Sequence, residues 1–189
     1  MTDLVEEALK LGFYAADTMD SSLLMPRKEV REMCAADRCH AYGKNWTCPP
    51  ACGTLEESVT RLQKYNRVLL VQSRGELEDE FDFEGMMDLE KQHKERFHAM
   101  AEIVRRVHPD ALCLGSGGCR ICAKCAYPEP CRFPEKACSS MEAFGLLVSE
   151  VCTACGMTYY YGKNTLAYEA CFVYQENLET QRHLMQPEE

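Results

Sequence analysis

Apolar residues recur at helical spacing in four stretches of the chain, and shorter apolar runs lie between them. Helices are predicted over residues 3–17, 54–65, 86–107 and 141–154. Strands are predicted over residues 67–72, 111–114 and 167–175, with residues 158–161 as a further candidate. The helix over 86–107 has the clearest pattern, because Phe97, Met100 and Val107 share one face and Pro109 follows its end. Strands that alternate with helices predict an α/β fold with a small, mainly parallel sheet flanked by helices.

Two segments interrupt this pattern, at about residues 30–53 and 115–138. Both are rich in Cys, Gly and Pro, and both are predicted to be irregular loops that bind metal. Loops that carry sites in open α/β sheets lie where strands end, so these two are expected at one end of the sheet. A chain of 189 residues suits one domain, so residues 1–189 are predicted to form a single α/β metal-binding domain.

The composition narrows the function. Hydrophobic residues make up 46% of the chain, which is enough for a core that does not depend on metal. The formal net charge of −9 argues against nucleic acid and anionic membranes as partners, because both attract basic surfaces. The acidic start is unlike a signal peptide, and no apolar run approaches the roughly 18 to 20 residues that span a bilayer. A cytoplasmic location is therefore predicted, where dense cysteine indicates metal or catalysis rather than disulfides.

Eight of the thirteen cysteines form two sets of four. The second set is Cys119-x2-Cys122-x2-Cys125-x5-Cys131. Three cysteines at two-residue gaps are typical of a chain that wraps one corner of a [4Fe–4S] cluster, whereas zinc sites more often show two separated Cys-x2-Cys pairs. The spacing favours an iron–sulfur cluster, with a zinc knuckle as the alternative.

The first set is Cys34-x4-Cys39-x8-Cys48-x3-Cys52, a looser spacing that matches no standard ferredoxin run. Four thiolates would complete a cluster, whereas three would leave one iron open to a small molecule, and the choice depends on Cys52. A zinc site, in which His40 could replace one cysteine, is the alternative. Tyr42 and Trp46 are predicted to shield this site from water.

Some of the remaining cysteines suggest a weaker possibility, a third metal site. Its candidate members are Cys138, Cys152, Cys155 and Cys171. Free cysteine is also a common buried small residue, and this is the preferred interpretation for them. Cys113 lies inside a predicted apolar strand and is expected in the core.

The motifs resemble a known family. Met33-Cys34 through Cys48-Pro49-Pro50 and Cys119-Arg-Ile-Cys122-Ala-Lys-Cys125 are similar to two signatures of DUF2284, a domain-of-unknown-function family of cysteine-rich predicted metal-binding proteins. The second signature continues through Pro130-Cys131-Arg-Phe-Pro134 and Ser140-Met-Glu-Ala-Phe-Gly145, so the resemblance covers roughly residues 30–150. The resemblance implies a cytoplasmic metal-binding protein, of a kind frequent in anaerobes, and no established reaction. It carries over to Cys34, Cys39, Cys48, Cys119, Cys122, Cys125 and Cys131, with Cys52 less firmly included.

Three functions are consistent with these features. The preferred prediction is an iron–sulfur protein in which the two sets bind two [4Fe–4S] clusters and electrons pass to a redox partner protein. The first alternative is an enzyme whose first cluster has three cysteine ligands and an open iron for Lewis-acid or sulfur chemistry. The second is a structural zinc-binding interaction module. Whether the chain is an enzyme is left open by the sequence.

Overall fold

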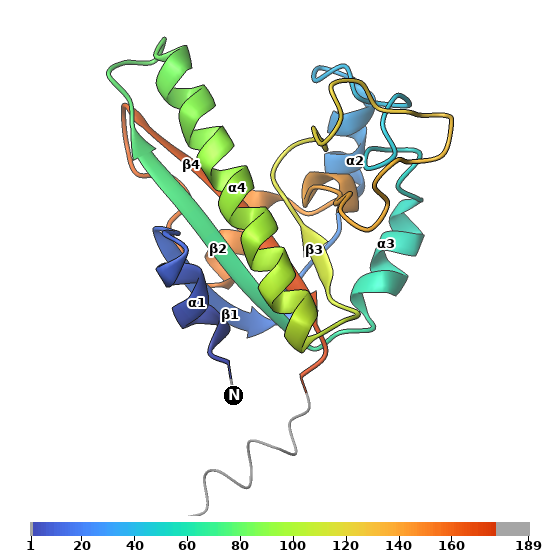
Figure 1. Cartoon of the computed structure of the whole chain (residues 1–189), viewed down its shortest axis with the longest axis horizontal. Coiled ribbons are helices and arrows are strands. Elements are labelled where there is room, and N and C mark those ends of the chain that lie inside the picture. Colours follow the sequence, from blue (N-terminus) through green and yellow to red (C-terminus); the bar gives the residue numbers. More distant parts are fainter. Residues whose placement is uncertain (1, 177–189) are drawn as a thin grey trace, which may run out of the picture.

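A four-stranded antiparallel sheet forms the centre of the computed structural model, which describes residues 2–176 (Figure 1). The strands are β1 (Ala15–Asp20), β2 (Arg67–Glu76), β3 (Leu112–Leu114) and β4 (Thr165–Tyr174). Their order across the sheet is β1-β2-β4-β3. The longest pairing joins β2 to β4, from Arg67 opposite Tyr174 to Glu76 opposite Thr165. The predicted domain, 1–189, extends beyond the described residues.

The prediction of a mainly parallel sheet is wrong, because every pair of neighbouring strands is antiparallel. The physical reason lies in the order of the strands. β2 and β3 both run opposite to β4, so they run in the same direction, as strands joined by a helical crossover do. β4, the last strand in the chain, inserts between them in the opposite direction, and local sequence patterns do not encode this insertion.

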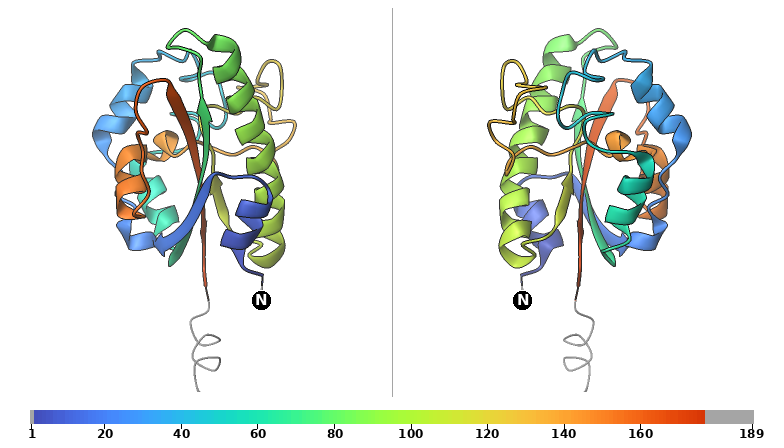
Figure 2. Two further views of the ribbon diagram at one scale, coloured as in Figure 1. Left: turned by 90° about the vertical axis from the view of Figure 1, so that its left-hand side faces the viewer. Right: turned by 90° about the vertical axis from the view of Figure 1, so that its right-hand side faces the viewer.

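Helices cover both faces of the sheet, which is seen edge-on in Figure 2. One face is covered by α1 (Leu4–Lys10) and α4 (Phe83–Val107). The other face is covered by α2 (Lys28–Ala35), α3 (Leu55–Leu62), α5 (Val148–Ala154) and the 3-10 helix η2 (Glu142–Phe144). A further short 3-10 helix, η1 (Ser21–Leu23), follows β1. Because both faces are covered, the apolar run of β2 from Val68 to Val71 is fully buried.

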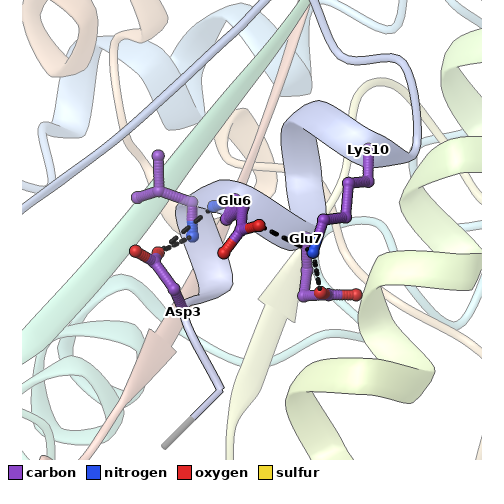
Figure 3. A network of polar contacts seen from close by, with 5 residues as sticks. Asp3, Glu6, Glu7 and Lys10 are labelled. Atoms are coloured by element: carbon purple, nitrogen blue, oxygen red, sulfur yellow. Dashed lines mark hydrogen bonds and ion pairs between the residues drawn. The ribbon is translucent and has the colours of Figure 1, made fainter.

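The helix predicted over residues 3–17 is shorter than expected. The Asp3 carboxylate accepts hydrogen bonds from the backbone N–H groups of Val5 and Glu6, and Lys10 pairs with Glu6 and Glu7 (Figure 3). The helix ends at once, because Gly12 adopts a φ of 90°. The chain then continues as β1, which pairs with β2. The sequence pattern does not indicate this strand, because Tyr14 and Ala15 continue the helical spacing.

Most other elements lie where the sequence predicts them. Helix α4, strands β2, β3 and β4, and helix α3 confirm the predictions for their regions within a few residues. The helix predicted over 141–154 is divided, because Gly145 adopts a φ of 80° between η2 and α5. Helix α2 was missed, since it lies mostly inside the segment predicted to be irregular. Residues 158–161 form no strand.

Two apolar clusters, one on each face of the sheet, make up the core. Phe97 and Phe172 stack in the cluster beneath α4, with ring centroids 5.4 Å apart. Leu70, Phe144 and Val151 belong to the cluster on the opposite face. None of the eight cysteines of the two predicted sets belongs to either cluster. Within residues 2–176, no helix is long and apolar enough to cross a bilayer.

Candidate metal centre

The first cysteine set is built on the end of α2 and the loop that follows it. Cys34 lies in the last turn of α2, and its thiol points to the backbone oxygen of Glu142, 3.8 Å away. Cys39 is exposed, two residues after Asp37, which adopts a positive φ of 50°. Cys48 and Cys52 are held in one turn, in which the N–H of Cys52 donates to the oxygen of Cys48 at 3.1 Å.

A capping box fixes the exit from this loop. The Thr54 side chain accepts from the N–H of Glu57, and the Glu57 carboxylate accepts from the N–H of Thr54. Gly53 turns the chain between the last cysteine and this cap with a φ of 103°. The position of Cys52 is therefore tied to the start of α3.

The four thiols of the first set lie close enough to interact electrostatically. Cys48 interacts with the other three, and Cys34 interacts with Cys39 and Cys52. Burial raises the pKa of Cys48 to about 11, and burial also raises the pKa values of Cys34 and Cys52. These thiols are therefore protonated near neutral pH without metal, so metal binding must displace their protons.

Arg31 stands behind the first set, one helical turn before Cys34. Its guanidinium donates to the sulfur of Cys52 at 3.8 Å, to the oxygen of Gly53 at 2.6 Å and to the oxygen of Ala143. It offers a positive charge to a site that concentrates negative charge when its thiols ionise. No sequence signal indicates this role for Arg31, because helix α2 was not predicted and the contact with Cys52 joins residues 21 positions apart.

The second cysteine set lies in the loop between β3 and η2. All four members, Cys119, Cys122, Cys125 and Cys131, line one cavity. Cys119 interacts electrostatically with the other three, and burial raises its pKa. The loop returns to the sheet where the N–H of Gly115 donates to the oxygen of Ser139 at 2.9 Å.

The two sets meet at a junction between their loops. The Asn45 side-chain amide donates to the oxygen of Cys119 at 3.1 Å, and the N–H of Cys119 donates to the Thr47 hydroxyl at 3.3 Å. A methyl group added at Gly118 would lie 3.6 Å from the sulfur of Cys48. From these contacts and standard bond lengths, the sulfurs of Cys48 and Cys119 lie within about 12 Å of each other.

The predicted shielding residues divide between the two sets. Tyr42 lines the pocket beside the first set. Trp46 lines the cavity of the second set, packs edge-on against Tyr127 at 5.0 Å and donates to the oxygen of Glu129 at 2.8 Å. Trp46 also lines the pocket that contains Cys52, so it lies beside both sets rather than beside the first alone. His40, the possible zinc ligand, is exposed.

A large pocket opens over the first set. It contains about 1420 Å³ of empty space, part of it continuous with solvent, and its lining is mostly apolar. Cys34, Cys39 and Cys48 line it, together with Glu142, whose Oε2 atom is buried without a hydrogen-bond partner. Cys52 faces a different pocket, which it shares with Cys131 of the second set. The first set thus presents three thiols to one side and the fourth to the other.

The candidate third site does not assemble. Cys152, Cys155 and Cys171 are buried in the apolar cluster on the α5 face of the sheet. Cys138 packs against the cluster on the α4 face. Burial raises the pKa values of Cys152 and Cys171, as expected of core thiols. Cys113 is 3% exposed, which confirms its prediction as a core residue.

All thirteen cysteines are free of disulfides. Within residues 2–176, no three His, Cys, Asp or Glu side chains meet closely enough to hold a single metal ion. The four cysteines of the second set instead line one cavity.

Comparisons with known proteins bear on the two cysteine sets. A family model described as predicted metal-binding protein (DUF2284) matches residues 17–173, so the chain belongs to that family. No curated protein and no solved structure matches the chain.

Proposed function

We propose that this member of the DUF2284 family binds two [4Fe–4S] clusters, one in each cysteine set, and passes electrons between them and a redox partner protein. The observation that carries the proposal is the junction of Cys48, Gly118 and Cys119, which brings the two sets together. Electron tunnelling weakens steeply with distance. Two clusters bound on either side of this junction would be close enough to exchange electrons without a mediator.

The donor chemistry supports clusters over single zinc ions. Each iron of a four-iron cluster takes one cysteine, so four thiolates must surround a space rather than meet at one point. Two observations support this for the second set: its four cysteines line one cavity, and their Cys-x2-Cys-x2-Cys spacing is that of ferredoxin-like sites. In the first set Arg31 compensates charge beside Cys52. A surface with a formal charge of −9 suits a basic partner protein and neither nucleic acid nor an anionic membrane.

Metal analysis tests the proposal directly. Protein purified without oxygen is analysed for iron, zinc and acid-labile sulfide per chain, and its visible spectrum is recorded. Two four-iron clusters require about eight irons and eight sulfides. One or two zinc ions without sulfide would refute the clusters and leave a zinc-stabilised binding module as the explanation.

Electron paramagnetic resonance tests the proximity of the two centres. In the fully reduced protein, two paramagnetic clusters this close should broaden and split each other's signals. Cys131→Ser should remove or convert the second cluster and leave the signal of the first uncoupled. Cys155→Ala, a change at a buried core thiol, is the matched control and should keep both clusters. Uncoupled signals in the wild-type protein would contradict the proposed junction.

The pocket over the first set favours a second candidate function. Three of its cysteines line a large pocket and Cys52 does not, so a cluster held only by those three would leave one iron open to a small molecule. Cys52→Ser discriminates the two functions, with Cys48→Ser as the control that should lose the cluster in both cases. A first cluster with an unchanged spectrum in Cys52→Ser would favour an enzyme. Loss or conversion of the cluster would favour the electron carrier.

A further inference from the structure

Two cysteines outside the proposed clusters lie side by side at the end of β3. Gly115, just after β3, forms a parallel bridge with Ser140. Hydrogen bonds from Gly115 to the oxygen of Ser139 and from Met141 to the oxygen of Gly115 hold this bridge. Cys113 lies two residues before Gly115, and Cys138 lies two residues before Ser140. In parallel pairing such residues stay opposite each other and on the same face.

This register suits a disulfide bond. Adjacent strands lie about 4.8 Å apart, within the range of Cα separations that disulfides span. Cys138 also packs against the apolar cluster that contains Cys113. The two thiols form a hydrogen bond, and its effect on their pKa values is opposite: it lowers that of Cys138 and raises that of Cys113.

Arg105, on α4, completes the arrangement. Its guanidinium donates to the sulfur of Cys138 at 3.4 Å and to the oxygen of Glu135 at 3.1 Å. The guanidinium charge favours the thiolate of Cys138, which is partly exposed, whereas Cys113 is buried. The pair therefore has an accessible thiolate beside a protected thiol, an asymmetry that is typical of exchange with disulfides.

The surroundings of Cys138 indicate which substrates reach it. Cys138 lines a cavity with the glycine-rich turn at residues 115–118, with Cys119 of the second set and with two positively charged side chains, Lys94 and Arg120. His98 also lines it, but burial lowers the pKa of that imidazole and leaves it neutral near neutral pH. Glu90 pairs with Lys94 and, at 3.7 Å, with Arg120, so it offsets only part of this positive charge. The cavity holds about 380 Å³ of empty space, part of it open to solvent, so it can take the reacting sulfurs of a small disulfide, whose carboxylate groups Lys94 and Arg120 would attract.

We propose that Cys138 and Cys113, which belong to neither cysteine set, form a redox-active dithiol that reduces small anionic disulfides. The Cys138 thiolate attacks one sulfur of the disulfide, the S–S bond breaks and the first thiolate leaves. The Cys113 thiol gives its proton to that thiolate, and its sulfur attacks the sulfur of Cys138. The Cys113–Cys138 bond forms and the second thiolate leaves. Two electrons pass from the dithiol to the substrate.

Oxidised glutathione is the probe, applied to anaerobically purified full-length protein with its metal content recorded before and after. Peptide mapping by mass spectrometry should find a Cys113–Cys138 disulfide in the wild-type protein. Cys113→Ala should stop at a mixed disulfide between glutathione and Cys138. Cys138→Ser should abolish the reaction at both positions. At a pH below the pKa of Cys138, Arg105→Met should slow the reaction about tenfold, because a rise of about one unit in that pKa lowers the thiolate fraction tenfold there.

Cys152→Ala, a change at a core thiol on the other face of the sheet, is the matched control and should react like the wild type. Circular dichroism checks that each variant is folded. The proposal is overturned if oxidised glutathione still oxidises Cys113 in folded Cys138→Ser to the same extent as in the control. It is also overturned if wild-type protein accumulates only mixed disulfides. The experiment measures the Cys113–Cys138 bond itself, so its result can be interpreted whether or not the protein contains clusters.

Discussion

Replacement of Gly145 by alanine should destabilise the protein and weaken the first cysteine set. Gly145 ends η2 with a φ of 80°, and its oxygen accepts from the N–H of Arg27 at 2.7 Å, just before α2 begins. An alanine Cβ there would lie 2.6 Å from a methyl group of Leu55 and 3.1 Å from the backbone oxygen of Arg27. The methyl group can rotate away, whereas the backbone at the start of α2 cannot move without shifting the helix.

The magnitude follows from two contributions. A left-handed backbone costs an alanine about 1–2 kcal/mol. Overpacking against a neighbour that cannot move adds about 1–3 kcal/mol. Gly156→Ala separates the two, because Gly156 also has a positive φ, 71°, but has nothing within 4 Å of an added Cβ. We therefore expect a loss of about 1–2 kcal/mol for Gly156→Ala and about 2–5 kcal/mol for Gly145→Ala.

Urea unfolding followed by circular dichroism measures both losses, in protein of equal metal content and with the slopes compared before conversion to free energy. Gly145→Ala should also lower metal occupancy at the first set, because the oxygens of Glu142 and Ala143 contact Cys34 and Cys52. Gly156→Ala should leave that occupancy unchanged. Equal losses of stability in the two variants would refute the packing argument.

Three further changes have defined outcomes. Phe172→Ala, at a fully buried ring stacked on Phe97, should cost about 3–5 kcal/mol in urea unfolding, and a loss below 1 kcal/mol would contradict the role of this ring in the core. Burial lowers the pKa of His93 from 6.5 to about 4, so only the unfolded chain takes up this proton as the pH falls from 6.5 toward 4. The wild-type protein should then lose up to about 3 kcal/mol of stability across that window, and His93→Gln should show a smaller pH dependence. Arg31→Met removes the guanidinium from the sulfur of Cys52, so a redox titration should find a lower potential for the first cluster and an unchanged one for the second.

The elements that the sequence predicts well are those whose burial leaves a local pattern. Helix α4 is long enough, with 25 residues, for its apolar face to repeat several times. Strands β2 and β4 read as continuous apolar runs because both faces of the sheet are covered. Strand β1 contains Asp17, Thr18 and Asp20 and forms only by pairing with β2, so no local pattern indicates it.

The candidate site likewise has parts that the sequence predicts and parts that it does not. The cysteine spacing predicts the two sets, since the cysteines of each set lie within one stretch of chain. The contact between the sets depends on Asn45 and Thr47 reaching Cys119, more than 70 residues away in the sequence. The partnership of Cys113 and Cys138 likewise depends on the bridge between Gly115 and Ser140. Such contacts follow from the path of the chain and are not encoded in the spacing of any motif.

The separation of the eight cysteines from both apolar clusters has a consequence for how the protein matures. In small zinc domains the ion must arrive before the chain can fold. Here the sheet and its helices bury their apolar surfaces without any of these thiols. We therefore expect the polypeptide to fold before it binds metal. A donor protein would then deliver the cofactor to a protein that is already folded. In a cell short of the metal, the metal-free protein would remain folded and available for loading, because degradation acts mainly on unfolded chains.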